Sequence, residues 1–397
     1  MSADPGIGAA PGDEAPSRRR RSDGFARAGI AQVVLVPASW VYGLAARLHR
    51  LFMRWTSGTR PRPACAIVSV GAMTVGGAGK TPLAARLASG LRDRGWRVVL
   101  ASRGYKGKAR EPVTLVSDGS HVHAYASEAG DESLVLAAHA PGVPVLVGRD
   151  RNVVGHEAVS RFGAEILLLD DGFQHHRLVR DLDIVSLDGR SGLGNGRVLP
   201  AGPLREPSSS LRHADWICLV DGDGAGGAPP GAARWLAKLE RAKRFVFRAR
   251  RRPSALFSLD GQERRPLGDL AGRRVGLISG IARPGSFRRS VESLGAIVVR
   301  ERHFRDHHAY APRDLRGLDP DVELWLTTEK DAIKILPSWA PEASIWVLQI
   351  ELEIEDEAAV LAAIETALQA SGRLSAREGA RDSTRPERST EKRAPLV

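Results

Sequence analysis

Residues 66–82 read AIVSVGAMTVGGAGKTP, and this stretch decides the fold. Residues 66–70 have the apolar composition of a short buried strand, and a glycine-rich loop follows them. An amphipathic segment begins directly after Lys80 and Thr81. A strand, a glycine loop and a helix in this order predict a phosphate site, because backbone N–H groups and a helix N-terminus attract phosphate oxygens. Lys80 would neutralise phosphate charge, and the Thr81 hydroxyl could bind Mg²⁺.

The loop departs from the usual pattern G-x-x-x-x-G-K-[ST] at its first position, where this chain has Thr74. A plain strand-to-helix turn would explain the glycines but not the adjacent lysine and threonine, so nucleotide binding is the better interpretation. The predicted nucleotide-binding residues are Thr74, Val75, Gly76, Gly77, Ala78, Gly79, Lys80 and Thr81.

Composition bounds the class of protein. A chain of 397 residues with 43% hydrophobic content can bury a large core, and its length favours two domains. The two cysteines are far apart and give no reason to expect a disulfide or a zinc site, which indicates a reducing compartment. The net charge of +12 favours an anionic partner, such as a nucleotide or a phospholipid surface. Nucleic acid is disfavoured as a partner, because aromatic residues make up only 5% of the chain and form no stacking patches.

The N-terminal region contains an uncharged stretch, IAQVVLVPASWVYGLAA, at residues 30–46. It is shorter than the roughly 20 apolar residues that span a bilayer, and Pro37 interrupts it. Arg47, Arg50 and Arg54 then alternate with apolar residues. This pattern favours a helix that lies in the membrane interface, with arginines facing anionic lipid. A helix that covers the globular core is the alternative.

A second chemical signal lies at residues 165–172, which read EILLLDDG. A buried parallel strand that ends in Asp170 and Asp171 delivers carboxylates to the sheet edge where a P-loop protein holds its metal. The sequence does not choose between the two acids.

Two loops are candidates for substrate contact. Tyr105 lies in a glycine-bearing loop after the strand predicted at residues 96–101, at the sheet edge where ligands bind. Residues 189–207 are rich in Gly, Pro and Arg without apolar periodicity, which indicates a structured functional loop. In it, Arg205 could pair with phosphate and Glu206 could orient Arg205.

The second half of the chain predicts a βαβ unit at residues 274–299, followed by a histidine-bearing segment at residues 302–315. Neighbouring imidazoles point in different directions and no cysteine completes a zinc set, so a transition-metal site is disfavoured. A base or a phosphate-binding group built on Asp306 and His307 is more economical, and it would reach the phosphate loop only across a domain cleft.

These segments together resemble the tetraacyldisaccharide 4′-kinase family, the lipid A 4′-kinases. The motifs that carry the resemblance occur in one order: SVGAMTVGGAGKTP (69–82), SRGYKGK (102–108), AGDE (129–132), PVLVGRDRN (144–152), LLLDDGFQHHRLVRD (167–181), GNGRVLPAGPLREP (194–207), FRDHHAY (304–310) and TEKDAIK (328–334). Even Thr74 matches the family. A regulatory P-loop GTPase is the alternative, but residues 328–331, TEKD, carry the residues of a guanine-binding [NT]-K-x-D motif in the wrong spacing.

The resemblance implies a membrane-associated P-loop kinase. We expect it to be peripheral on the cytoplasmic face of the inner membrane and to be a monomer, with no nucleic acid as a partner. It would transfer the γ-phosphate of ATP to the 4′-hydroxyl of a tetraacylated disaccharide 1-phosphate, yielding lipid IVA. The implied roles, residue by residue, are base for Asp131 with His307, phosphate binding for Lys80, Mg²⁺ binding for Thr81 and Asp170 or Asp171, and ligand contact for Tyr105, Arg205 and Glu206. The choice between His307 and His308 stays open.

The sequence thus predicts an α/β protein with a P-loop NTPase-like parallel-sheet domain, a smaller α/β domain and an N-terminal membrane-associating helix. The expected boundaries are 1–28 disordered, 29–58 helix, 59–230 P-loop kinase domain, 231–370 smaller domain and 371–397 disordered tail.

Overall fold

The computed structural model describes residues 19–57, 60–221, 245–341 and 343–375. Of residues 1–28, which the sequence predicts to be disordered, 1–18 lie outside these ranges, whereas 19–28 belong to a helix. Most of the predicted disordered tail at residues 371–397 also lies outside them.

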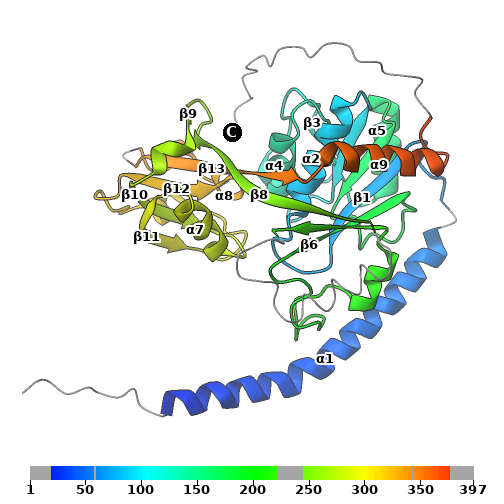
Figure 1. The fold of residues 1–397 in the computed structure, drawn as a ribbon. Coiled ribbons are helices and arrows are strands. Elements are labelled where there is room, and N and C mark those ends of the chain that lie inside the picture. Colours follow the sequence, from blue (N-terminus) through cyan, green and yellow to red (C-terminus); the bar gives the residue numbers. More distant parts are fainter. Residues whose placement is uncertain (1–18, 58–59, 222–244, 342, 376–397) are drawn as a thin grey trace, which may run out of the picture.

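One mostly parallel sheet runs through the described chain, and two lobes form around it (Figure 1). The strand order is β11-β10-β12-β13-β8-β7-β6-β1-β5-β2-β4-β3, with β9 paired to β8. The strands are β1 Ala66–Ala72, β2 Val98–Ser102, β3 Thr114–Ser117, β4 Val145–Val147, β5 Ile166–Asp170, β6 Leu182–Asp188, β7 Trp216–Val220, β8 Phe245–Ser258, β9 Arg264–Arg265, β10 Arg274–Ser279, β11 Ile297–His303, β12 Leu324–Thr328 and β13 Ile345–Ile354. The predicted α/β class is confirmed.

The helices cover both faces of the sheet, which explains why its central strands are apolar without alternation. They are α1 Arg19–Ser57, α2 Lys80–Asp93, α3 Ala126–Ala129, α4 Asp131–His139, α5 Arg151–Phe162, α7 Pro284–Glu292, α8 Glu329–Ala332 and α9 Glu357–Ala370. Short 3₁₀ helices lie at Ser208–His213, Leu267–Leu270, Pro312–Leu315 and Pro337–Trp339. Helix α2 packs with α4 and α9 on one face of the first lobe, while α5 covers the other face.

In the first lobe, β1 lies between β5 and β6, and both pairings are parallel. The carboxyl ends of the three strands therefore meet at one edge, directly beside the N-terminus of α2. This arrangement places the glycine loop and the acids after β5 together, as the sequence predicts.

Strands β8 and β13 connect the two lobes. Strand β8 pairs in parallel with β7 over Phe245–Ala249 and antiparallel with β13 over Ala249–Ser258. After β13 the chain returns to the first lobe, where α9 packs against α2 (Figure 1). The first lobe thus includes segments from the second half of the chain, which the sequence boundary at residue 231 does not anticipate because the long strand β8 belongs to both lobes.

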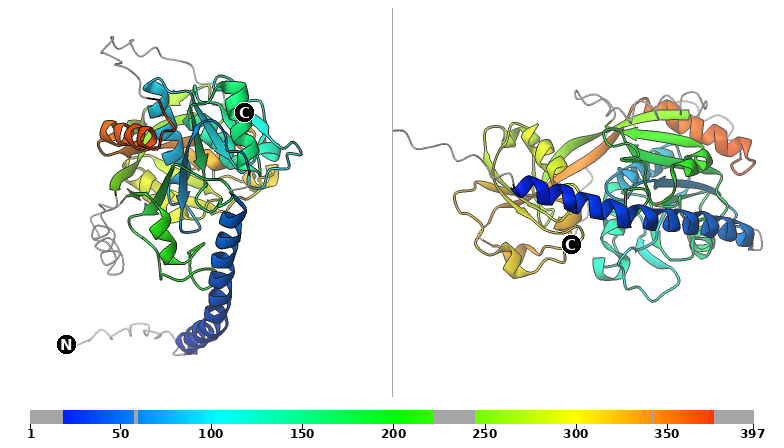
Figure 2. Two further views of the ribbon diagram at one scale, coloured as in Figure 1. Left: turned by 90° about the vertical axis from the view of Figure 1, so that its right-hand side faces the viewer. Right: turned by 90° about the horizontal axis from the view of Figure 1, so that it is seen from below.

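Helix α1 projects from the first lobe and runs beneath the body of the molecule (Figure 2). Its inner side contacts the glycine-rich loop: Ser39 Oγ donates to the carbonyl of Val198 at 2.9 Å, and Tyr42 Oη donates to the carbonyl of Arg205 at 3.1 Å. No helix among the described residues is both long and apolar enough to cross a membrane.

Candidate active site

The phosphate loop sits between β1 and α2. Gly79 caps α2 with a φ of 80°, a left-handed conformation that favours glycine, and a Cβ there would lie 3.3 Å from Val220. Residues 73–75 are held from the side, because Val75 N–H donates to the carbonyl of Pro203 at 2.8 Å and Thr74 forms a β-bridge with Leu204. The threonine at the irregular loop entrance is therefore a bridge position that does not require glycine.

Lys80 lies in a cage of carboxylates. Its Nζ is 3.3 Å from Oε2 of Glu132 and 3.8 Å from Oδ2 of Asp171, and the residue is buried. Burial opposes its charge, but Asp170, Asp171 and Glu132 outweigh that effect and raise the pKa of Lys80. Glu132, which is not among the site residues predicted from the sequence, thus joins the phosphate loop to α4.

Asp170 and Thr81 form the candidate metal position. Thr81 Oγ1 donates to Oδ2 of Asp170 at 3.0 Å. Asp170 is buried, and within the described chain its Oδ1 has no hydrogen-bond partner. Burial raises the pKa of Asp170 to about 6. A hydroxyl beside a buried carboxylate oxygen that has no partner within the described chain fits a hard cation such as Mg²⁺, which prefers oxygen ligands. The described residues contain no cluster of three or more His, Cys, Asp or Glu that could hold a metal ion, so carboxylates alone do not form the candidate position.

Asp171 faces Arg205 instead. Nη1 of Arg205 lies 2.9 Å from Oδ1 and 2.8 Å from Oδ2 of Asp171. Burial alone would raise the pKa of Asp171, yet the charges of Lys80 and Arg205 outweigh it and lower that pKa. Asp171 has a φ of 57°, a left-handed conformation uncommon for a residue with a side chain, and such strain is typical of functional positions.

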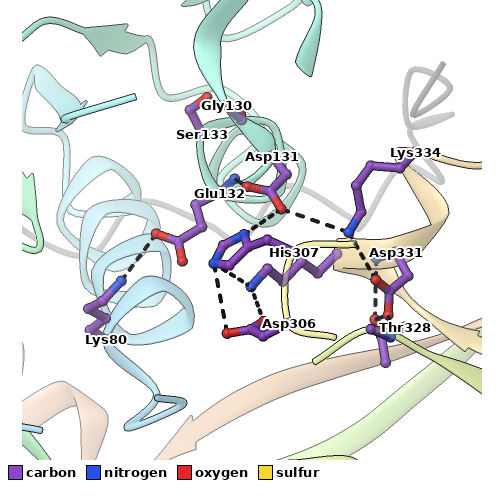
Figure 3. Close-up of polar contacts among 12 residues, drawn as sticks. Lys80, Gly130, Asp131, Glu132, Ser133, Asp306, His307, Thr328, Asp331 and Lys334 are labelled. Carbon is purple, nitrogen blue, oxygen red and sulfur yellow. Dashed lines mark hydrogen bonds and ion pairs between the residues drawn. The ribbon is translucent and has the colours of Figure 1, made fainter. Parts of the chain in front are cut away.

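Asp131 and His307, the residues predicted to form the catalytic base, meet across the two lobes (Figure 3). We call them the Asp131–His307 pair. Nδ1 of His307, from the loop after β11, lies 3.0 Å from Oδ2 of Asp131 at the first residue of α4. Both side chains are at least four-fifths buried, since 13% and 8% of their surfaces are exposed. His308 turns away and bonds Asp314 at 3.0 Å, so the structure places His307, and not His308, against Asp131.

Tyr105 lies at the exposed edge of this pair. Its ring centroid is 5.6 Å from that of His307 in an edge-on arrangement, and 55% of the residue is exposed. Gly107 and Gly130 allow the Tyr105 loop to reach α4: a Cβ on Gly107 would lie 2.3 Å from the carbonyl of Glu128, and one on Gly130 would lie 2.5 Å from that of Tyr105.

Glu206 is placed differently from the other predicted ligand contacts. It is buried, and its carboxylate pairs with Arg50 of α1 and, at 3.0 Å, with Nε2 of His176. Burial opposes ionisation, but the hydrogen bond from His176 and the charge of Arg50 lower the pKa of Glu206. Glu206 therefore attaches the loop that carries Arg205 to α1, whereas the guanidinium of Arg205 itself faces Asp171.

Residues 328–331 do not form an edge that could bind guanine. Asp331 is fully buried, and its carboxylate accepts from Gly280 N–H at 2.8 Å, from Thr328 Oγ1 at 2.9 Å and from Lys334 Nζ at 3.0 Å. Its hydrogen-bonding capacity is used inside the second lobe, so the structure removes the feature on which the GTPase alternative depends.

Comparison with known proteins agrees with this geometry. Residues 31–369 match the model of the family described as tetraacyldisaccharide-1-P 4′-kinase. A tetraacyldisaccharide 4′-kinase of Syntrophus aciditrophicus is 42% identical over 305 residues, covering 74% of this chain and 81% of that protein. One of Anaeromyxobacter is 44% identical, covering 72% and 78% of the two chains. The crystal structure of LpxK from Aquifex aeolicus in complex with ATP superposes with a TM-score of 0.66 and 30% identity, covering 84% of this chain and 98% of that one.

Proposed function

Since the chain belongs to the tetraacyldisaccharide-1-P 4′-kinase family, it is a tetraacyldisaccharide 4′-kinase, and we propose a role in its reaction for each residue gathered at the phosphate loop. The enzyme uses ATP to phosphorylate the 4′-hydroxyl of a tetraacyldisaccharide 1-phosphate, giving lipid IVA in lipid A biosynthesis. The observation that carries the proposed roles is the 3.0 Å contact between Asp131 and His307. Asp131 precedes Glu132 on α4, and Glu132 pairs with Lys80 of the phosphate loop.

In this proposal Asp131 accepts the proton of the 4′-hydroxyl. The freed oxygen attacks the γ-phosphorus, a new P–O bond forms, and the bond to the leaving ADP breaks with its electron pair on ADP. His307 holds the carboxylate of Asp131 in place, and Lys80 neutralises charge on the phosphates. Positioning and charge neutralisation supply most of the acceleration in phosphoryl transfer.

Mg²⁺ would be held by Thr81 and Asp170, with Asp171 beside them. Asp170 is the better direct ligand, because its Oδ1 is unpartnered within the described chain, whereas Arg205 occupies both oxygens of Asp171. When bound, the cation supplies charge neutralisation to the β- and γ-phosphates. The proposed ligand contacts are Arg205 and Tyr105, which is exposed beside the Asp131–His307 pair.

Mass spectrometry of the acceptor tests the activity and the metal together. With ATP and Mg²⁺, the tetraacylated disaccharide 1-phosphate should gain one phosphate, and chelation of divalent ions with EDTA should lower turnover by at least about a hundredfold. Added Mg²⁺ should restore turnover. An acceptor that gains no phosphate under the full mixture would reject the activity, and full turnover in EDTA would reject the metal role alone.

We also propose that α1 attaches the enzyme to the cytoplasmic face of the inner membrane without crossing it. Its outer side presents large exposed apolar residues at helical spacing: Trp40, Val41, Leu44, Leu48, Leu51, Phe52 and Trp55. Its inner side packs against the body through Ser39, Gly43 and Arg50. A stripe this large that the described chain leaves uncovered suits a lipid interface, and exposed Arg47 favours anionic headgroups. We propose a monomer, because one chain supplies both the phosphate loop and the Asp131–His307 pair.

Vesicle flotation measures this attachment. The double variant Leu44→Asp with Leu51→Asp should reduce binding to vesicles of phosphatidylglycerol and phosphatidylethanolamine by at least about tenfold, because two apolar side chains that are 58% and 65% exposed would no longer enter the interface. His49→Asp is the matched control, since His49 is also exposed on α1 but lies off the apolar stripe. Equal flotation of the double variant and the wild type would contradict the proposed membrane face.

A further inference from the structure

Lys330 lies beside the Asp131–His307 pair and carries a charge. Neither the motifs nor the proposed reaction assigns it a role. It lies in α8 of the second lobe, within the motif at residues 328–334. Its Nζ is 3.1 Å from Nε2 of His307 and 3.0 Å from Oδ1 of Asp306. The imidazole therefore meets a carboxylate at one nitrogen and an ammonium at the other.

This arrangement fixes the proton on the imidazole. An ammonium group can only donate hydrogen bonds, so Nε2 of His307 must accept one, and the ring proton must then be on Nδ1. A proton on Nδ1 points at Oδ2 of Asp131, 3.0 Å away. The other oxygen of Asp131 accepts the N–H of Glu132 at 3.1 Å, so both carboxylate oxygens have donors.

The ammonium also separates the imidazole from a second carboxylate. Oδ2 of Asp306 is 3.9 Å from Nε2 of His307, so without Lys330 the ring would lie between two anions. An imidazole between two carboxylates favours the doubly protonated, charged form. Burial alone would raise the pKa of Asp306, but the hydrogen bond and the charge of Lys330 outweigh burial and lower that pKa. Lys330 and Asp306 therefore interact closely.

We propose that Lys330 is a positioning residue of the Asp131–His307 pair: it keeps His307 as the neutral Nδ1–H tautomer, which donates to Asp131 without adding the positive charge that would make this carboxylate a weaker acceptor of the substrate proton. The inference rests on the proposed role of Asp131. Lys330 acts through His307 and binds no phosphate in this proposal.

Steady-state kinetics of Lys330→Met provide the first test. We expect kcat to fall by about 10- to 100-fold, with the KM for ATP and for the acceptor changed by less than about threefold, because a base with the wrong proton arrangement loses part of its contribution while ligand binding is retained. Arg300→Met is the matched control: it also removes a cation from the second lobe, but Arg300 is mostly exposed and pairs with Asp319. Thermal unfolding and ATP binding should remain near wild-type values.

The pH profile separates this role from a merely structural one. His307 is faced by Asp131 from α4, by Lys330 from α8, by Asp306 from its own loop and by Tyr105 from the loop after β2. With the ammonium removed, the imidazole would face Asp131 and Asp306 without a cation beside it, so the acidic limb of the kcat profile should move to higher pH. The wild type and Arg300→Met should keep the same limb.

Chemical rescue keeps the proposal testable if the methionine variant folds poorly. Lys330→Cys should be as impaired as Lys330→Met, and alkylation with 2-bromoethylamine should restore most of kcat by rebuilding an ammonium at the same reach. Alkylation with iodoacetamide, which adds a neutral group, should not. The native Cys65 and Cys218 are buried and should react slowly by comparison.

Three outcomes would overturn the assignment. An unchanged kcat and pH profile in Lys330→Met would reject it outright. A raised KM for ATP with normal kcat would make Lys330 a phosphate ligand instead. Rescue by iodoacetamide as complete as by bromoethylamine would make its role one of packing. If Asp131→Asn is inactive while Lys330→Met is normal, the proposed base stands and only the lysine assignment fails; an active Asp131→Asn would reject the base itself.

Discussion

Replacing Asp131 with asparagine is expected to lower kcat by about a thousandfold, the largest catalytic loss from a single change of nearly equal volume. The amide cannot accept a proton from the 4′-hydroxyl, and general-base assistance of this kind contributes roughly 10²- to 10⁴-fold. In the wild type, Nδ1 of His307 lies 3.0 Å from a carboxylate oxygen of Asp131. In the variant, the asparagine could offer Nδ1 only the neutral amide oxygen as a hydrogen-bond acceptor. Single-turnover phosphorylation of the acceptor at saturating ATP measures the loss.

The control for this variant separates chemistry from folding. ATP affinity should change little, because Glu132, and not Asp131, pairs with Lys80 of the phosphate loop, whereas Asp131 pairs with His307. Asp93→Asn on α2 is the matched variant: it removes a carboxylate from an exposed position of the same lobe and should leave kcat unchanged. A kcat for Asp131→Asn within tenfold of the wild type would mean that another group accepts the proton.

The sequence predicts the local parts of this site well, because each depends on the end of one strand. The glycine loop after β1 and the acids after β5 are local features, and parallel pairing of β1 with β5 brings them to one edge. The proposed choice of Asp170 over Asp171 as the metal ligand could not be made from sequence, since it rests on the contact of Arg205 with Asp171, which follows from the loop that pairs with residues 73–75.

Features that depend on the relation of the two lobes were harder to predict. The pairing of Asp131 with His307 came from the family resemblance, because no local pattern reports where two distant loops meet. Lys330 was visible only as part of a motif. Its role depends on how β8 and β13 set the second lobe against α4, and the pairing of these two strands joins residues about 100 positions apart, which a local sequence pattern does not report. The return of α9 to the first lobe follows from the same two strands.

Arg50 illustrates a different limit. An arginine among apolar residues near the N-terminus reads as a lipid-facing cation, and Arg47 on the same helix is indeed exposed. Arg50 instead faces inward, is buried and pairs with Glu206. The helix period separates the two positions, but which side of α1 faces the body becomes clear only once the loop at residues 198–207 is in place. Helix α1 therefore both presents the apolar stripe and supports the loop that carries Arg205.

The second large effect is expected from Lys80→Met, which should abolish measurable phosphoryl transfer, a loss of at least about a thousandfold. Without this ammonium, Asp170, Asp171 and Glu132 would repel the triphosphate, so ATP binding should weaken as well as kcat fall. The structure should also lose stability, because removing one partner of a buried charge cluster costs about 3 to 5 kcal/mol. Lys80→Arg, which keeps the charge in a larger group, should retain stability better than activity.

The pH dependence of unfolding identifies the cause of that lost stability. In Lys80→Met the buried carboxyl of Asp170 loses the cation that opposes its desolvation, so its pKa, which is already raised to about 6 in the wild type, should rise further above that in the unfolded chain. A carboxyl with a raised pKa in the folded state destabilises the protein above that pKa, and the penalty disappears as pH falls through it toward the unfolded value of about 4. The difference in melting temperature between wild type and variant should therefore be largest near pH 8 and shrink toward pH 5. A difference that stays constant across this range would show that Lys80 stabilises the loop by packing of its methylene chain and that charge repulsion among the acids is minor.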